Sequence, residues 1–146
     1  MFKKGFTLIE LLVVMGVLAV LAAGLVVAIN PADKLKAAND AKVQSDISQI
    51  ATAANAYATS KNGFYPANQT DLTGNGDLSS AVSAPTGYTA YAFALTPSPC
   101  TGGTTCTSII VSGQLKSQKY TATQFWKWDS LAGKMCAAAT AATACP

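Results

Sequence analysis

The stretch Lys3-Lys4-Gly5-Phe6-Thr7-Leu8-Ile9-Glu10 leads into a long apolar segment, and together they decide the fold. The residues that follow, 11–29, are nineteen in a row without a charged side chain. A helix over 8–29 would be about 33 Å long, enough to cross the hydrocarbon core of a membrane. Glu10, the single glutamate of the chain, lies at the edge of this segment, where an unpaired carboxylate is costly.

Two ordinary explanations fit these residues only in part. A secretory signal peptide would use the Lys3-Lys4 pair as its basic start, but Glu10 interrupts its apolar region and the run continues to Ile29. A plain membrane anchor would keep the lysine pair in the cytoplasm and place the rest of the chain outside. In an anchor, Glu10 would only need to extend its carboxylate toward the membrane surface.

A third explanation accounts for more of these residues. The stretch 3–10 resembles the processing site of class III signal peptides, which type IV pilins and the pseudopilins of type II secretion carry. The resemblance implies that a prepilin peptidase removes residues 1–5 by cutting between Gly5 and Phe6, and that Phe6 is then N-methylated. It also implies that Glu10 pairs with the Phe6 amine of a neighbouring subunit. Glu10 would then be costly in one subunit and neutralised in a polymer.

The composition argues against several other classes of protein. The chain has ten basic residues, all of them lysine, no histidine, and a net charge of +3. Because no basic stripe and no arginine fork is present, nucleic acid is not an expected partner. Without histidine there is no Ser–His or Cys–His pair, and the six aspartates are mostly scattered. We therefore expect no enzymatic activity and no cofactor.

Residues 30–61 continue as an amphipathic helix. Taken locally, Asn30 is an N-cap and Pro31 the first residue of a second helix, whereas the resemblance implies one long helix that bends or melts at Pro31. Apolar residues at spacings of three and four predict a face that packs on a sheet. They are Val43, Ile47, Ile50, Ala54 and Tyr57. Asp40 is expected on the solvent face, and residues 61–63 end the helix.

Residues 62–87 are expected to form a turn-rich connection. Oxygen-bearing side chains alternate along 71–77 with a glycine for a sharp turn, which partly resembles a calcium-binding loop. The pattern departs from the EF-hand at Val82, where the bidentate glutamate would stand. We therefore expect a plain turn and no metal here. The alternative is calcium bound by Asp71, Asn75 and Asp77.

The remaining segment, 88–146, predicts an antiparallel sheet followed by a C-terminal loop. Strand patterns cover 88–95, 108–111 and 119–128. In the last of these, Trp126 and Trp128 share one face, which we expect to cover the helix, and Phe125 and Lys127 share the other.

All four cysteines lie in this segment. Their even number, together with a membrane-directed start, predicts two disulfides formed in an oxidising compartment. Three pairings are possible. We prefer the pairs that are close in sequence, Cys100–Cys106 and Cys136–Cys145, because each closes a short loop.

Together these features predict an α+β fold, with a long N-terminal helix packed on a small antiparallel sheet of three or four strands. The helix is hydrophobic over 6–29 and amphipathic over 30–61. The resemblance implies a prepilin, cleaved after Gly5 and polymerised with identical subunits into an extracellular type IV pilus. Before assembly it would cross the inner membrane once, in contact with lipid.

Its partners would be prepilin peptidase and the inner-membrane pilus or secretion platform. A pseudopilin of a periplasmic type II secretion filament is the alternative within the same class. A monomeric, membrane-anchored binding domain is the alternative from a different class, and it would need neither the cut after Gly5 nor Glu10.

Overall fold

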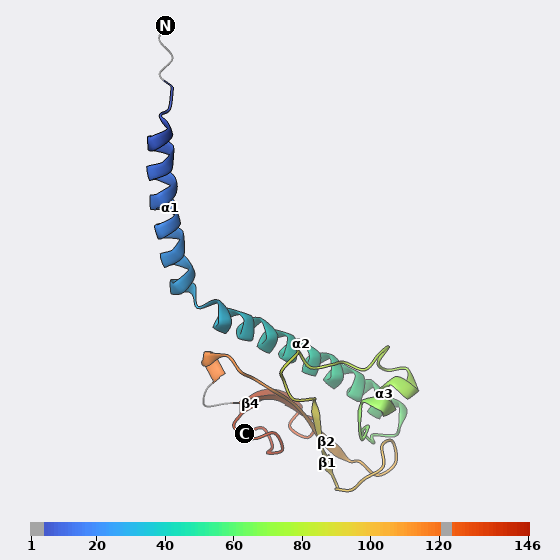
Figure 1. The fold of residues 1–146 in the computed structure, drawn as a ribbon. Coiled ribbons are helices and arrows are strands. Elements are labelled where there is room, and N and C mark those ends of the chain that lie inside the picture. Colours follow the sequence, from blue (N-terminus) through green and yellow to red (C-terminus); the bar gives the residue numbers. More distant parts are fainter. Residues whose placement is uncertain (1–4, 121–123) are drawn as a thin grey trace. The chain divides into compact units, whose positions relative to one another are not determined.

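The computed structural model describes residues 5–120 and 124–146, and the chain divides into two compact units at Leu35–Lys36 (Figure 1). The helices are α1 (Leu8–Ile29), α2 (Pro31–Ser60), α3 (Gln69–Asn75) and the short 3₁₀ helix η1 (Gln118–Tyr120). The strands are β1 (Ala92–Thr96), β2 (Ser108–Gln114), β3 (Phe125–Asp129) and β4 (Lys134–Ala138). The layout is α+β, as the sequence predicts.

Helix α1 is apolar on every side. Its window Leu8–Val26 has a mean hydropathy of 2.6, and none of that window is buried. It is the one helix in the described part of the chain that is long and apolar enough to cross a membrane. A helix of a soluble domain carries a polar face, and α1 has none, so its surface requires lipid or other helices as a cover.

The two long helices are separated by one residue, Asn30. This residue adopts the left-handed conformation (φ 46°, ψ 71°), which asparagine tolerates better than most residues. Pro31 then begins α2, where its missing N–H has no cost, and the Asn30 carbonyl accepts from the N–H groups of Asp33 and Lys34 at 3.1 and 3.3 Å. The structure therefore begins a separate helix at Pro31, as the local pattern predicts, but Asn30 is the left-handed C-cap of α1 and not the predicted N-cap.

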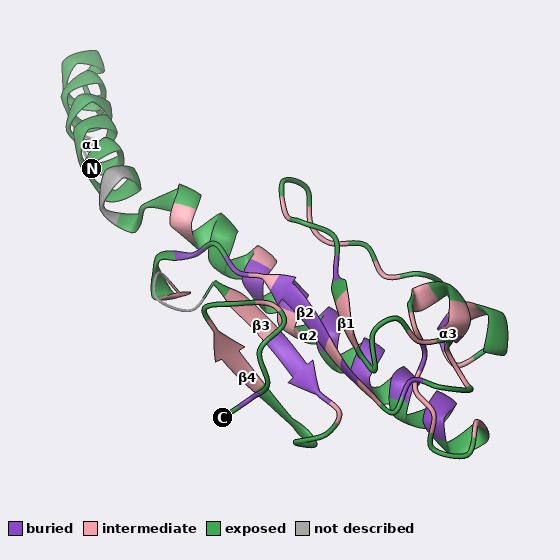
Figure 2. Cartoon of the chain, turned by 90° about the horizontal axis from the view of Figure 1, so that it is seen from below, coloured by how far each residue is buried: buried purple, intermediate pink, exposed green. Residues whose placement is uncertain are grey.

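The second unit is built on the contact between α2 and one face of the sheet. The sheet has the order β1-β2-β3-β4 with every neighbouring pair antiparallel. The predicted stripe of α2 is at most 5% exposed, and it packs with Val111 of β2 and Trp128 of β3. Figure 2 shows the buried residues gathered along α2, β2 and β3. The predicted packing face of α2 is therefore confirmed.

Gly113 of β2 sets how closely helix and sheet approach. A Cβ atom at this position would lie 2.6 Å from Val43 Cγ1 and 2.9 Å from the Tyr91 ring. Such distances are shorter than van der Waals contact, so only glycine fits between α2 and the sheet at this point.

The prediction that Asp40 lies on the solvent face of the helix is wrong, because Asp40 is buried. It is 2% exposed, and its carboxylate accepts from Lys116 N (2.9 Å), Ser117 N (2.8 Å) and the Tyr88 hydroxyl (2.9 Å). Burial opposes ionisation, but the hydrogen bonds from Ser117, Lys116 and Tyr88 outweigh it and lower the pKa of Asp40. Position 40 lies three residues before Val43, in phase with the apolar stripe, so the helical period places it on the buried face.

Three further differences concern element boundaries. Helix α3 lies within the expected connection 62–87, where Asn68 caps its start by accepting from Asp71 N at 3.1 Å and Gly76 ends it in the left-handed conformation. Strand β4 is the fourth strand of the sheet, and it lies after the last predicted strand, where no strand pattern was identified. The strand expected over 119–128 is shorter, with η1 before it, and residues 121–123 lie outside the described residues.

The close approach at Gly113 predicts the effect of enlarging it. The Gly113→Ala variant should lose about 1–3 kcal/mol of unfolding free energy, since Val43 and Tyr91 must move to admit the methyl group. Urea unfolding of the detergent-solubilised chain, followed by tryptophan fluorescence, measures this. Gly74→Ala is the matched control, because a Cβ atom there meets nothing within 4 Å, and it should be neutral or slightly stabilising. Equal stability of the two variants would contradict the packing argument.

Candidate assembly site

The start of α1 is a reciprocal hydrogen-bonded cap formed by Thr7 and Glu10. Thr7 is the N-cap, and its hydroxyl oxygen accepts from Glu10 N at 3.3 Å. In return the Glu10 carboxylate accepts from Thr7 N at 3.3 Å and from the Thr7 hydroxyl at 3.1 Å. This is the capping box, in which a residue at the third helical position satisfies the backbone of the cap.

Glu10 therefore has a partner inside its own chain. It also lies in the first turn of α1, where the positive end of the helix dipole favours a carboxylate. The sequence analysis assigned Glu10 only an intermolecular partner. The spacing Thr7-x-x-Glu10 before an apolar run is the signal that identifies the capping box from sequence.

The peptide bond between Gly5 and Phe6 precedes this cap and lies outside any helix. Residues 5–7 have no helical structure and are exposed, with Phe6 80% exposed. A Cβ atom at Gly5 would meet nothing within 4 Å. Among the described residues, nothing covers the bond between Gly5 and Phe6. Lys3 and Lys4 lie outside the described residues.

One side of α1 is indented at Gly16. The missing side chain leaves a groove of about 420 Å³ on this face of the helix. Its walls are entirely apolar: Leu12, Val13, Val17, Val20 and Leu21. Small residues let a second helix approach closely in apolar surroundings, so a helix could pack closely on this face of α1.

The comparison with known proteins agrees with this geometry. Residues 1–26 match the prokaryotic N-terminal methylation motif. This motif is the class III signal peptide of type IV pilins and pseudopilins, so the resemblance found in residues 3–10 is confirmed. The match covers the Gly5–Phe6 bond, Glu10 and most of α1, and it supports a protein that is similar to type IV pilins or pseudopilins. No curated protein and no solved structure matches the chain.

The second unit contains two disulfides, Cys100–Cys106 and Cys136–Cys145, with Cα atoms 5.1 and 5.9 Å apart. They join the pairs that are close in sequence. The first closes a loop that is hydrogen-bonded to Tyr65, whose N–H donates to the Cys106 carbonyl at 2.8 Å. The second joins β4 to the C-terminal loop.

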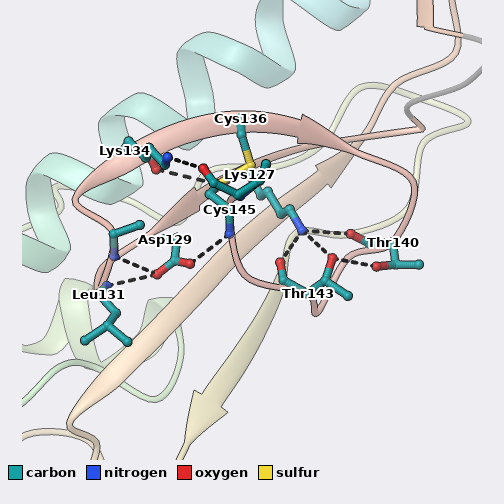
Figure 3. The surroundings of a disulfide bond; sticks show 10 residues. Lys127, Asp129, Leu131, Lys134, Cys136, Thr140, Thr143 and Cys145 are labelled. Carbon is teal, nitrogen blue, oxygen red and sulfur yellow. Dashed lines mark hydrogen bonds between the residues drawn. A yellow bond between two sulfur atoms is a disulfide. The ribbon is translucent and has the colours of Figure 1, made fainter.

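The C-terminal loop covers the face of the sheet opposite α2, and Lys127 holds it there (Figure 3). Lys127 is fully buried, and it lies opposite Cys136 in the β3–β4 ladder. Its ammonium donates to Thr140 O at 3.1 Å, to Thr143 Oγ1 at 2.8 Å and to Thr143 O. An ammonium has three N–H groups, and here each has an acceptor in the loop. Burial lowers the pKa of Lys127, while the nearby charge of Asp129 acts in the opposite direction.

Asp129, two residues further along β3, makes a second connection. It is 3% exposed, and its Oδ2 accepts from Cys145 N at 3.0 Å. Its Oδ1 accepts from Leu131 N and Ala132 N at 2.9 and 3.2 Å, which fixes the turn between β3 and β4. Burial alone would raise the pKa of Asp129, but the backbone hydrogen bonds and Lys127 outweigh it and lower the pKa.

The sequence analysis missed these partners. It placed Lys127 on the strand face opposite the two tryptophans, which the pleat requires, and for the C-terminal loop it predicted only the disulfide Cys136–Cys145. The alternation Trp126-Lys127-Trp128-Asp129 is the available signal, because a charged side chain between two core residues in a strand faces the other side of the sheet.

The three residues considered as calcium ligands, Asp71, Asn75 and Asp77, form hydrogen bonds with nearby residues of the chain. Asp71 lies in the first turn of α3 and accepts from Ala67 N at 2.7 Å, and Asn75 donates to Asp77 Oδ2 at 2.6 Å. Among the described residues, no three or more His, Cys, Asp or Glu side chains are grouped to hold a metal ion. Calcium binding at Asp71, Asn75 and Asp77 stays a hypothesis.

The lowered pKa values of Asp40 and Asp129 predict acid sensitivity. Because their pKa values fall below the unfolded value of about 3.9, their ionised forms stabilise the fold at neutral pH, and this contribution is lost as the pH falls through the lower folded values. Asp129→Asn should cost about 1–3 kcal/mol at pH 7, and its difference from wild type should shrink toward pH 2. Urea unfolding across that pH range measures both effects. Asp77→Asn is the control, and a constant Asp129→Asn difference at all pH values would contradict the assignment.

Proposed function

We propose that the chain is a prepilin, a structural subunit that is stored in the inner membrane and polymerised into a type IV pilus. The observation that carries this proposal is the methylation motif at residues 1–26, combined with an α1 surface that has no cover of its own. A helix that is apolar on all sides is stable in lipid as a single subunit and in a bundle of identical helices as a filament.

Processing would create the second half of an ion pair. Cleavage between Gly5 and Phe6 leaves an amine at Phe6, which is then N-methylated and keeps its positive charge. Thr7 and Glu10 both remain after this cut, so the capping box can persist in the mature chain. The carboxylate of Glu10 can accept further hydrogen bonds, and we propose that the Phe6 amine of the neighbouring subunit supplies them.

The energetics of assembly make this pair important. Moving α1 from lipid into a helix bundle buries no additional apolar surface from water, because lipid tails are as apolar as the helix. The driving force must then come from close packing, for which the groove at Gly16 is suited, and from polar groups that are costly in lipid. Glu10 is the ionisable residue of α1, so it selects the register in which neighbouring helices meet.

The extracellular location and the partners follow from the same proposal. Lys3 and Lys4 favour a cytoplasmic start, which places the sheet-containing unit outside the membrane. Two disulfides in that unit fit an oxidising compartment. Prepilin peptidase and an inner-membrane assembly platform would be the partners before the filament forms.

The N-terminus tests the processing step. Mass spectrometry of the subunit purified from cell envelopes should find N-methylated Phe6 as the first residue. A control with Gly5→Leu should accumulate uncleaved chain, because a bulky residue replaces the glycine before the cut. A wild-type chain that retains Met1 would contradict the proposal. So would a chain that begins near Leu25, because the small residues Ala22, Ala23 and Gly24 before it could form the cleavage site of a secretory signal peptide.

Glu10 tests the assembly step. The Glu10→Ala variant should insert and be cleaved, but the sheared filament fraction should fall about tenfold or more, since the Phe6 amine loses its partner. Immunoblotting and electron microscopy of that fraction measure this. Thr7→Ala is the matched control, because it removes the cap and leaves the carboxylate. If the two variants lose filaments equally, Glu10 acts only within its own helix, and the intersubunit pair is wrong.

A further inference from the structure

The sheet-containing unit displays one large apolar side chain almost fully to solvent. Leu131, in the turn between β3 and β4, is 85% exposed, and the other exposed large apolar residue in the described part of this unit, Met135, is 36% exposed. Single exposed leucines are common and need no explanation by themselves. The turn that carries this leucine is fixed by several hydrogen bonds.

The turn at Leu131 is held in one conformation by buried groups. Asp129 receives the N–H groups of Leu131 and Ala132 with one carboxylate oxygen, and Gly133 N donates to the Asp129 carbonyl at 2.9 Å (Figure 3). Ser130 is bonded to Ile109 twice, through its own N–H (3.0 Å) and through its hydroxyl oxygen (2.8 Å). Burying a carboxylate is costly, and an apolar side chain on a rigid turn loses little entropy on binding. Leu131 therefore has the properties of an interface anchor.

A complementary surface lies elsewhere on the same unit. A groove of about 520 Å³ runs between α2 and residues 76–79. Its apolar floor is formed by Ala53 and Leu78, which are 5% and 4% exposed, and Ala56 beside them is exposed. The Thr52 hydroxyl donates to the Ser48 carbonyl at 2.9 Å. Asp77 also lines this groove, and the exposed Lys134 lies three residues after Leu131. Lys134 begins β4 directly after the leucine turn, and its ammonium donates to the Pro146 carbonyl. Asp77 accepts from Asn75 Nδ2 at 2.6 Å. A positive charge therefore lies beside the leucine turn and a negative charge lies at the groove, each with one hydrogen-bond partner in its own chain.

We propose that Leu131 of one subunit docks in the groove lined by Ala53, Ala56 and Leu78 of a second copy of this chain, with Lys134 facing Asp77. A projection and a groove at different places on one molecule form a head-to-tail contact, which repeats along a polymer instead of closing a dimer. This inference rests on the proposed function, since it assigns a contact between neighbouring subunits of the filament. It concerns the sheet-containing unit and is independent of the pair between Glu10 and Phe6.

Site-directed cross-linking in assembled filaments tests the contact. The full-length chain with Leu131→Cys and Ala56→Cys is expressed in cells, and sheared filaments are treated with a short bismaleimide. The native cysteines are all in disulfides, so the new thiols react selectively. A ladder of covalent oligomers is expected. Leu131→Cys with Ser45→Cys is the matched control, because Ser45 is exposed on the same helix outside the groove, and it should give no ladder.

Assembly of substituted chains provides a second readout. Leu131→Ser should reduce sheared filaments about fivefold or more while the subunit accumulates normally in the membrane, and Leu131→Met should retain them. Lys134→Asp and Asp77→Lys should each reduce the amount of sheared filaments. The double variant, in which the two charges are exchanged, should form more filaments than either single variant.

The experiments distinguish failure of the docking contact from failure of the proposed function. Filaments that form normally but give no ladder, with Leu131→Ser assembling like wild type, would overturn the docking contact and leave the pilus intact. A wild-type chain that forms no filament at all would overturn the proposed function, and the docking contact with it.

Discussion

The constraint on which the rest of the molecule depends is that α1 cannot cover itself. Its apolar window is entirely unburied, and no face of it is polar. Water is therefore excluded as its surroundings, and lipid or other helices must take that place. Because both of these are apolar, the change from one to the other cannot be driven by hydrophobic burial. In the proposed filament, polar groups at the edge of the helix would decide between lipid and other helices, and Thr7 and Glu10 are the hydrogen-bonded polar pair at that edge.

In the sheet-containing unit, each face of the sheet is covered by a different segment of the chain. A small sheet has two faces, and α2 covers one of them with the stripe from Val43 to Tyr57. The other face is covered by a loop of small and polar residues that brings backbone carbonyls rather than apolar side chains. An apolar side chain at position 127 would leave the carbonyls of Thr140 and Thr143 without donors. A lysine supplies three donors, which explains a buried ammonium on a sheet face.

Local patterns predicted much of this fold, and long-range partners account for what they missed. The stripe of α2 follows from spacing alone, and the methylation motif from residues 3–10. The burial of Asp40 was not predicted because its donors, Lys116 and Ser117, lie more than seventy residues away. The hydrogen bonds of Lys127 to the C-terminal loop likewise depend on the pairing of β3 with β4, which no local pattern specifies. The spacing of the capping box is present in the sequence. It was missed because a partner for Glu10 was sought only in a neighbouring subunit or at the membrane surface.

Asp129 connects the turn between β3 and β4 with the C-terminal loop, on the face of the sheet opposite α2. One of its oxygens binds the turn that carries Leu131, and the other binds the N–H of Cys145, the residue that closes the second disulfide. Asparagine has a single acceptor oxygen, so it could accept from the N–H groups of the turn or from the N–H of Cys145, but not from both places at once. The carboxylate therefore makes the conformation of the turn and the position of the C-terminal loop interdependent. A change that loosens the loop should loosen the turn as well, so the rigidity of the exposed leucine depends on residues that no partner would touch.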